Sequence, residues 1–157
     1  MASKKSLDSA YMDLALRWSS LSEAKRKKVG CIIVKNGAII SDGYNGTPSG
    51  FNNECEFHEP INGEKMTIDY EGNFVEGTYQ LTTKPEVLHA ESNAITKLAK
   101  STQSSESSTM YITISPCVDC AKLIIQSGVK RVAYGEVYRN KEGINLLEKA
   151  KIQVDKI

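Results

Sequence analysis

Apolar residues recur at steps of three and four near the N-terminus, which is the stripe of an amphipathic helix. The stripe begins at Leu7 and predicts a helix that ends near Ser22. A β-branched run over 29–34 then leads into Asn-Gly at 36–37, a dipeptide typical of a two-residue hairpin turn, and 38–44 supplies the returning strand. The pattern therefore predicts a helix followed by a β-hairpin.

The next stretch, 46–84, has no long periodic segment, and Gly, Pro, Asn and Glu are scattered through it. We expect a long loop insertion there, with a second small hairpin around 71–73. A loop of this length inside a compact domain is usually either functional or a poorly ordered insertion.

Helices and strands alternate in the second half of the chain. Pro85 is expected to open a helix that ends before the polar run 101–109. This order, αββαβαβαβ, predicts an α/β domain with a mixed sheet covered by helices on its faces. The remaining predicted elements are a buried strand at 110–114, a helix from Pro116 to Gly128, a strand at 130–134, a helix at 143–149 and a short strand at 152–154.

Composition indicates one ordinary globular domain over 1–157. Of the 157 residues, 40% are hydrophobic and 25% are charged, and a chain of this length buries roughly 70% of its unfolded surface without disulfides. Twenty basic and 19 acidic side chains give a net charge of +1, which provides no bulk attraction to nucleic acid or to an acidic membrane. The apolar runs are shorter than the roughly 18 to 20 residues of a membrane span, so we expect a cytoplasmic protein.

Two short motifs carry the chemistry: His-Ala-Glu at 89–91 and Pro-Cys-Val-Asp-Cys at 116–120. Together they match the signature of zinc deaminases, although each half alone is weak. A catalytic zinc takes three protein ligands and leaves its fourth position to water, so His89, Cys117 and Cys120 supply the expected number of ligands. A Cys-x-x-Cys at the start of a helix also gains from the positive helix N-terminus, which favours thiolates.

Glu91 is the expected proton carrier. Two residues along a helix are separated by about 200° around its axis, so Glu91 cannot bind the metal side by side with His89. This suits a carboxylate that takes a proton from water and returns it to the substrate. The alternative reading makes Cys117 and Cys120 a redox pair or half of a structural zinc site.

Further blocks add to these motifs, and with them the chain resembles the deoxycytidylate (dCMP) deaminases of the cytidine deaminase-like superfamily. The resemblance implies a three-layer domain with a mixed five-stranded sheet and helices on both faces. It implies zinc-dependent hydrolysis of dCMP to dUMP and ammonia, which supplies dUMP for thymidylate synthesis. The additional blocks are Val-Gly-Cys-Ile-Ile-Val at 29–34, Gly-Tyr-Asn-Gly at 43–46 with Pro48 and Gly50, Asn-Ala-Ile at 93–95, and the continuation from Pro116 to Gly128.

The same resemblance implies ligand contacts. Asn45 is similar to the family residue that contacts the substrate nucleoside, and Ala90 offers its backbone to the base; the alternative for Asn45 is a turn residue with positive φ. Many relatives are homohexamers that are activated by dCTP with Mg²⁺ and inhibited by dTTP, which implies an effector site near Gly43, Tyr44, Asn45 and Gly46.

Three further features lie outside the zinc motifs. Arg26 and Arg139 are candidates for binding a 5′-phosphate, against the alternative that a basic run is a solvated face. Cys55 and His58 are candidate ligands of a second, structural zinc, against a free thiol and a surface histidine. Cys31, within a predicted strand, is expected to be a small apolar side chain.

Two other function classes remain open. A tRNA adenosine deaminase or a free-base deaminase shares both zinc motifs, although RNA enzymes usually carry a more basic surface. A non-enzymatic, zinc-stabilised binding domain would unfold without metal and show no turnover. Glu91 argues against this last class because a purely structural site does not need it.

Overall fold

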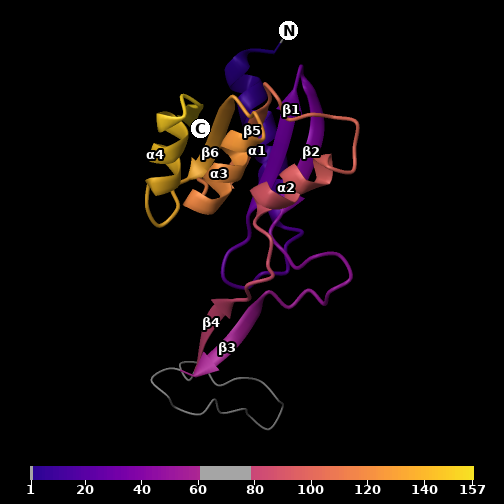
Figure 1. The fold of residues 1–157 in the computed structure, drawn as a ribbon, viewed down its shortest axis with the longest axis vertical. Helices are drawn as coiled ribbons and strands as arrows, with labels where there is room; N and C mark the ends of the chain where they lie inside the picture. The colour runs from indigo at the N-terminus through magenta and orange to yellow at the C-terminus, as the bar shows by residue number, and fades with distance from the viewer. Residues whose placement is uncertain (1, 61–78) are drawn as a thin grey trace.

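A five-stranded sheet forms the centre of the computed structural model, which describes residues 2–60 and 79–157 (Figure 1). The strand order is β2-β1-β5-β6-β7. β1 is antiparallel to both β2 and β5, whereas β5, β6 and β7 run parallel, so the sheet is mixed as predicted. The strands are β1 (Gly30–Lys35), β2 (Ala38–Tyr44), β5 (Thr109–Ile114), β6 (Arg131–Glu136) and β7 (Gln153–Lys156).

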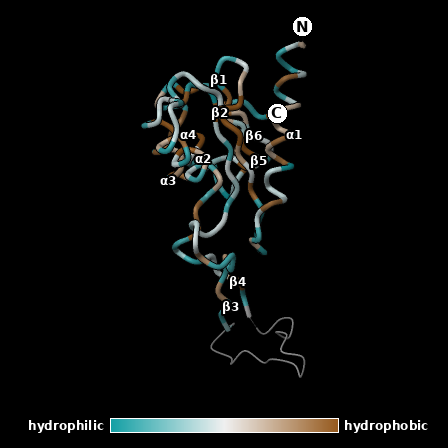
Figure 2. The backbone as a smooth tube through the Cα atoms, turned by 90° about the vertical axis from the view of Figure 1, so that its right-hand side faces the viewer, coloured by the Kyte–Doolittle hydropathy of each residue, from teal (hydrophilic) through white to brown (hydrophobic). Residues whose placement is uncertain are grey.

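Helices cover both faces of this sheet, which confirms the three-layer α/β arrangement (Figure 2). α1 (Lys4–Ser19) covers one face, where Met12 and Ala15 pack among buried side chains of β1, β5 and β6. The opposite face buries a larger apolar cluster beneath three helices. These helices are α2 (Ala90–Leu98), α3 (Val118–Gln126) and α4 (Glu142–Lys149).

The turn between β1 and β2 follows directly from its two residues. Asn36 has a φ of 51° and Gly37 a φ of 76°, so both lie in the left-handed region. That pair of conformations matches the twist of a two-residue hairpin, and Asn-Gly adopts it at low cost. The predicted hairpin is therefore confirmed to within one residue at each strand end.

α2 begins later than its sequence pattern suggested. The predicted start at Pro85 is wrong, because this proline opens a turn and the helix begins at Ala90. Leu88 is instead held in an extended bridge to Gly46, with N···O distances of 3.1 and 2.9 Å in the two directions. This long-range pairing overrides the local helical period and leaves His89 as the N-cap of α2.

The insertion contains a second, two-stranded sheet. β3 (Glu56–Pro60) pairs antiparallel with β4 (Tyr79–Thr83), and this pair projects away from the body of the molecule (Figure 1). The small hairpin predicted around 71–73 lies outside the described residues. Within the described parts of the chain, no helix is long and apolar enough to cross a membrane.

A buried ionic network fixes α1 to the sheet. The guanidinium of Arg131 on β6 donates two hydrogen bonds of 2.8 Å to the two carboxylate oxygens of Asp8 on α1. Tyr111 Oη donates to Asp8 at 2.7 Å, and Arg131 Nε donates to Asp155 at 2.6 Å. Since the side chains of Arg131 and Asp8 are only 11% and 12% exposed, removing one partner would leave the other charge buried and uncompensated.

Candidate active site

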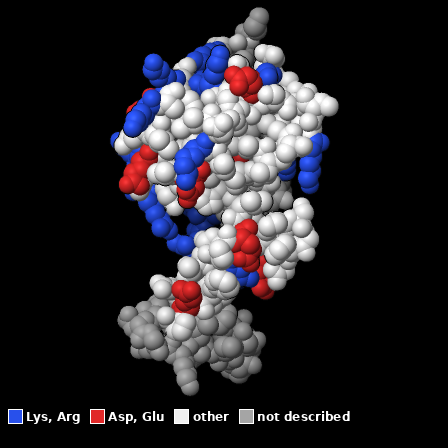
Figure 3. Space-filling model, in the orientation of Figure 1, with Lys and Arg blue, Asp and Glu red and all other residues white. Residues whose placement is uncertain are grey.

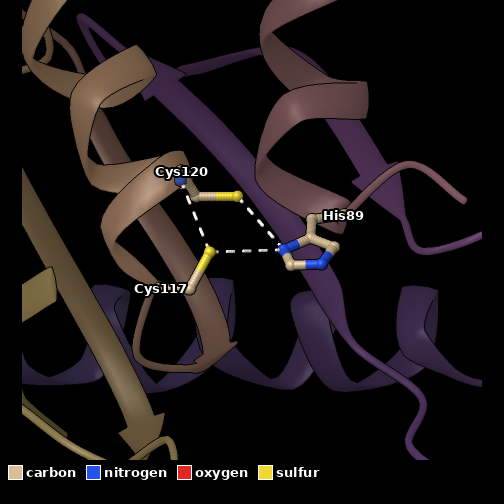
Figure 4. A group of neighbouring side chains, drawn as sticks. All are labelled: His89, Cys117 and Cys120. Carbon is tan, nitrogen blue, oxygen red and sulfur yellow. Dashed lines mark hydrogen bonds between the residues drawn. The ribbon is translucent and has the colours of Figure 1, made fainter. Parts of the chain in front are cut away.

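Two helix N-termini bring the sequence motifs together (Figure 4). His89 is the N-cap of α2 and Cys117 is the N-cap of α3, and both have the extended backbone that an N-cap requires. Cys120 lies one turn into α3. Motifs that are about thirty residues apart in the sequence therefore meet because the two helices begin beside each other.

The three potential ligand atoms face one another. His89 Nδ1 lies 3.6 Å from Cys117 Sγ and 3.3 Å from Cys120 Sγ, and the Cys120 N–H donates to Cys117 Sγ at 3.5 Å. All three ligand atoms lie within 4.8 Å of one another, and no other group of three such residues occurs in the part of the chain that the structure describes. One imidazole nitrogen and two sulfurs fit a zinc site that keeps an open position.

The two thiols of the site differ in how easily they lose their protons. A hydrogen bond from the Cys120 thiol, assisted by His89, lowers the pKa of Cys117 to about 4. The pKa of Cys120 is raised, because its proton is held by Cys117 and because the side chain is buried. The hydrogen bond to Cys117 in turn raises the pKa of His89. Cys117 is thus the thiolate of the pair, and a bound cation would displace the proton that Cys120 retains.

Glu91 lies in the first turn of α2, only 4% exposed, and it borders the same cleft as His89 and Cys117. Burial raises the pKa of its carboxyl above the usual value. A carboxyl whose pKa is raised toward neutrality is suited to accepting and donating a proton. Glu91 is not part of the group of three ligand residues.

A cleft of about 520 Å³ opens in front of these residues. Arg26 borders it from the loop between α1 and β1, and Arg139 borders it from the segment after β6. Asn45 and Ala90 also line it, so the structure brings together at one cleft every residue proposed from the sequence for substrate binding. Figure 3 shows acidic and basic side chains interspersed over the body, with basic ones set into the hollow above the projecting hairpin.

The side chain of Asn45 forms hydrogen bonds to the backbone of the loop that lines this cleft. Its Oδ1 accepts from the Val29 N–H at 2.8 Å, and its Nδ2 donates to the Lys27 carbonyl at 2.8 Å. Asn45 is not among the residues with positive φ, so the alternative reading as a left-handed turn residue is wrong. The side chain instead fixes the backbone of the basic loop.

A second cavity of about 260 Å³ lies beside the first, and Tyr44, Asn45 and Gly46 line it. Gly43 does not line it. A Cβ at Gly43 would collide with the backbone of Ala90 and Ala94, so this glycine permits the close packing of β2 against α2.

Cys55 and His58 do not form a metal site with other described residues. Cys55 is buried, and its thiol donates to the Asn53 carbonyl at 3.6 Å, while His58 pairs with Leu81 across the two strands of the hairpin. Cys31 is fully buried in β1, as expected of an apolar side chain.

The sequence reasoning missed several cleft residues. Lys27 forms an ion pair of 2.9 Å with Glu136, and both border the cleft together with Tyr138. The basic run contained Lys27, but nothing in the local pattern distinguished it from its neighbours. Glu56, at the base of the projecting hairpin, also went unnoticed because its contacts are all distant in sequence.

Comparisons with known proteins agree with this geometry. A family model described as the cytidine and deoxycytidylate deaminase zinc-binding region matches residues 5–136. The deoxycytidylate deaminase of Enterobacteria phage T4 is 38% identical over 93% of this chain and 87% of its own length. The crystal structure of dCMP deaminase from the cyanophage S-TIM5, in complex with dCMP and dUMP, has a TM-score of 0.81 and 42% identity, covering 99% of this chain and all of that one.

A more distant neighbour shows the fold alone. A structure from studies of A-to-I editing by tRNA:A34 deaminases has a TM-score of 0.58 at 17% identity, covering 95% of this chain and 98% of that one. The three-layer arrangement is therefore common to proteins with different substrates, and the fold by itself does not select among them.

Proposed function

The chain belongs to the cytidine and deoxycytidylate deaminase family, and from that premise we propose that it hydrolyses dCMP to dUMP and ammonia with the help of zinc. The observation that carries this proposal is one cleft that joins a His/Cys/Cys group, a buried carboxyl and two arginines. The three ligand residues suit zinc, the carboxyl suits proton transfer, and the arginines suit a nucleotide rather than a free base.

His89, Cys117 and Cys120 would hold the zinc. When bound there, zinc is a Lewis acid that lowers the pKa of water toward about 7. Glu91 takes a proton from the attacking water, whose oxygen adds to C4 of cytosine, and passes it to the ring nitrogen. Glu91 then takes the remaining proton from the C4 hydroxyl and delivers it to the amino group, so that the C4 carbonyl of dUMP forms as the C4–N bond breaks and ammonia leaves. The raised pKa of Glu91 supports this two-way transfer.

Substrate binding uses the walls of the cleft. Asn45 contacts the nucleoside, and the Ala90 backbone meets the base, where the first-turn N–H groups of α2 have no partner within the helix. Arg26 and Arg139 bind the 5′-phosphate, and a guanidinium can do so through two parallel hydrogen bonds. Their place on two separate segments of the cleft wall supports a phosphate held between them.

Regulation and assembly belong to the same proposal. The second cavity, bordered by Tyr44, Asn45 and Gly46, has room for part of a nucleotide, and Asn45 borders both cavities. We assign it to dCTP with Mg²⁺ as activator and dTTP as inhibitor, acting within a hexamer in the cytoplasm. Sigmoidal dCMP saturation that becomes hyperbolic with dCTP would support this assignment. A structural zinc at Cys55 and His58 stays a prediction.

Ammonia release tests the proposed function directly. The zinc-loaded protein is assayed with dCMP, CMP, deoxycytidine, cytosine and an adenosine-containing tRNA anticodon stem. We expect dCMP to have the highest kcat/KM. Preferred turnover of cytosine or of the tRNA would overturn the proposal in favour of a free-base or tRNA deaminase, and no turnover of any substrate would favour a zinc-stabilised binding domain.

A further inference from the structure

The loop that carries Arg26 has few hydrogen bonds within itself, such as the one from the Ala24 N–H to Ser22 Oγ. Residues 20–29 connect α1 to β1 without regular structure, and Lys25, Arg26, Lys27 and Lys28 are four consecutive positive charges. Like charges at such short range repel one another, and backbone N–H groups outside a helix or sheet need other partners. The conformation of this loop therefore depends on contacts from elsewhere in the chain.

Asn45 holds the loop at Lys27 and Val29, and the contacts at Lys25 and Arg26 come from the base of the projecting hairpin. Glu56 Oε1 accepts hydrogen bonds from the N–H groups of Lys25 and Arg26, at 2.9 and 3.1 Å. Thr83 Oγ1 accepts from Arg26 Nη1 at 3.2 Å. Glu56 and Thr83 face each other as a cross-strand pair of β3 and β4, so one pair of residues holds Arg26 by both its backbone and its guanidinium.

Because Glu56 is buried, its hydrogen bonds to the loop are stronger than they would be in water. The residue is only 6% exposed, and a buried carboxylate is stable only where charge-assisted hydrogen bonds replace its water. A carboxylate beside a cleft for a phosphate would also repel the ligand unless donors compensated its charge. The bond to Thr83 uses one of the five N–H donors of the guanidinium, which leaves the fork able to engage an anion.

We propose that Glu56 and Thr83 are positioning residues, which hold Arg26 in the orientation that binds the 5′-phosphate of the substrate. The hairpin insertion thereby determines the preference for nucleotides over nucleosides. This inference rests on the proposed function, because it requires a phosphorylated substrate. Neither residue touches the reacting atoms; both act through Arg26.

Product binding isolates the effect. The affinities of the zinc-loaded protein for dUMP and for deoxyuridine are measured by calorimetry, and their ratio reports the contribution of the phosphate alone. We expect Arg26→Ala to lower this ratio by about 10- to 100-fold. Glu56→Ala should lower it on the order of 10-fold and Thr83→Val about 3-fold, with deoxyuridine binding unchanged. Glu56→Gln, which keeps an acceptor oxygen, should restore most of the ratio.

A double variant and a control complete the test. Since Glu56 acts through Arg26, adding Glu56→Ala to Arg26→Ala should cause no further loss. Glu59→Ala is the matched control, because Glu59 lies on the same strand but is exposed and accepts only from Thr82 in the described contacts; the ratio should not change.

Equal weakening of dUMP and deoxyuridine by Glu56→Ala, or full additivity with Arg26→Ala, would overturn the inference. If Glu56→Ala does not fold, Thr83→Val decides alone, and an unchanged ratio in that variant overturns it. The binding ratio does not depend on turnover. A wild-type protein that binds dUMP but releases no ammonia from dCMP therefore contradicts the proposed function, not the inference.

Discussion

Replacing Glu91 by Gln removes the proposed proton carrier and changes little else. The two side chains have nearly the same shape, and Glu91 is 4% exposed, so its packing in the first turn of α2 is retained. Burial raises the pKa of the Glu91 carboxyl, which means that the ionised form is unfavourable in the folded protein. A neutral amide avoids this cost, so the metal-free variant should be at least as stable as the wild type near neutral pH.

The expected loss of rate is large because the amide cannot carry a proton. General acid–base catalysis typically contributes 10²- to 10⁴-fold, and Glu91 is assigned both the uptake and the delivery of protons. We therefore expect kcat for dCMP to fall by at least about 100-fold. Zinc content should stay at the wild-type level, because the ligand group consists of His89, Cys117 and Cys120 without Glu91.

Three measurements on the same samples separate these effects: metal analysis, ammonia release and thermal unfolding. Glu86→Gln is the matched control, since Glu86 is exposed and lies outside the lining of the cleft. A near-normal rate in Glu91→Gln would show that another group moves the proton. Loss of zinc in that variant would show instead that the carboxyl helps to hold the metal.

Three further predictions concern metal, phosphate and stability. Cys117→Ala should lose both zinc and activity, and full zinc content by metal analysis would refute its role as a ligand. Arg139→Ala should lower kcat/KM for dCMP by about 10-fold or more without changing that for deoxycytidine; equal losses in steady-state assays would remove it from the phosphate site. Asp8→Asn breaks a buried ion pair and should lower the free energy of unfolding at pH 7 by about 3 kcal/mol in urea titrations. Arg131 lowers the pKa of Asp8 below 3.8, so this stabilisation is present above that pH and is lost as the pH falls through the lower folded-state pKa; a difference between wild type and variant that does not shrink as the pH is lowered below 3.8 would contradict it.

The sequence was sufficient to predict the elements whose conformation depends mainly on residues close to one another in the chain. Asn36 and Gly37, flanked by two strand-forming runs, adopt the expected hairpin turn, and Gly128, with a φ of 78°, ends α3 as expected. The zinc motifs were also readable, because a Cys-x-x-Cys at a helix start presents both sulfurs from one turn. Chemistry carried by residues close in sequence is visible before the fold is known.

Long-range pairing accounts for what the sequence did not reveal. The helical period of Val87 and Leu88 is real, yet their segment is extended because Leu88 bonds to Gly46. The two strands of the projecting hairpin, 56–60 and 79–83, pair with each other although they lie about twenty residues apart in the sequence. A local sequence pattern therefore could not predict their pairing. Glu56 belongs to no recognisable sequence motif. Its hydrogen-bond partners, the N–H groups of Lys25 and Arg26, lie about thirty residues away in the sequence.

Asn45 shows how these long-range contacts combine at the cleft. Its amide ties the backbone of Lys27 and Val29 to the end of β2, while Glu56 holds the same loop at Lys25 and Arg26. The loop is therefore fixed at two points by side chains from two different segments. Asn45 also borders the second cavity, so a ligand bound there would contact one of those two points directly. A shift of Asn45 by such a ligand would move the loop that carries Arg26, so a ligand in the second cavity would change the affinity for the nucleotide through this loop.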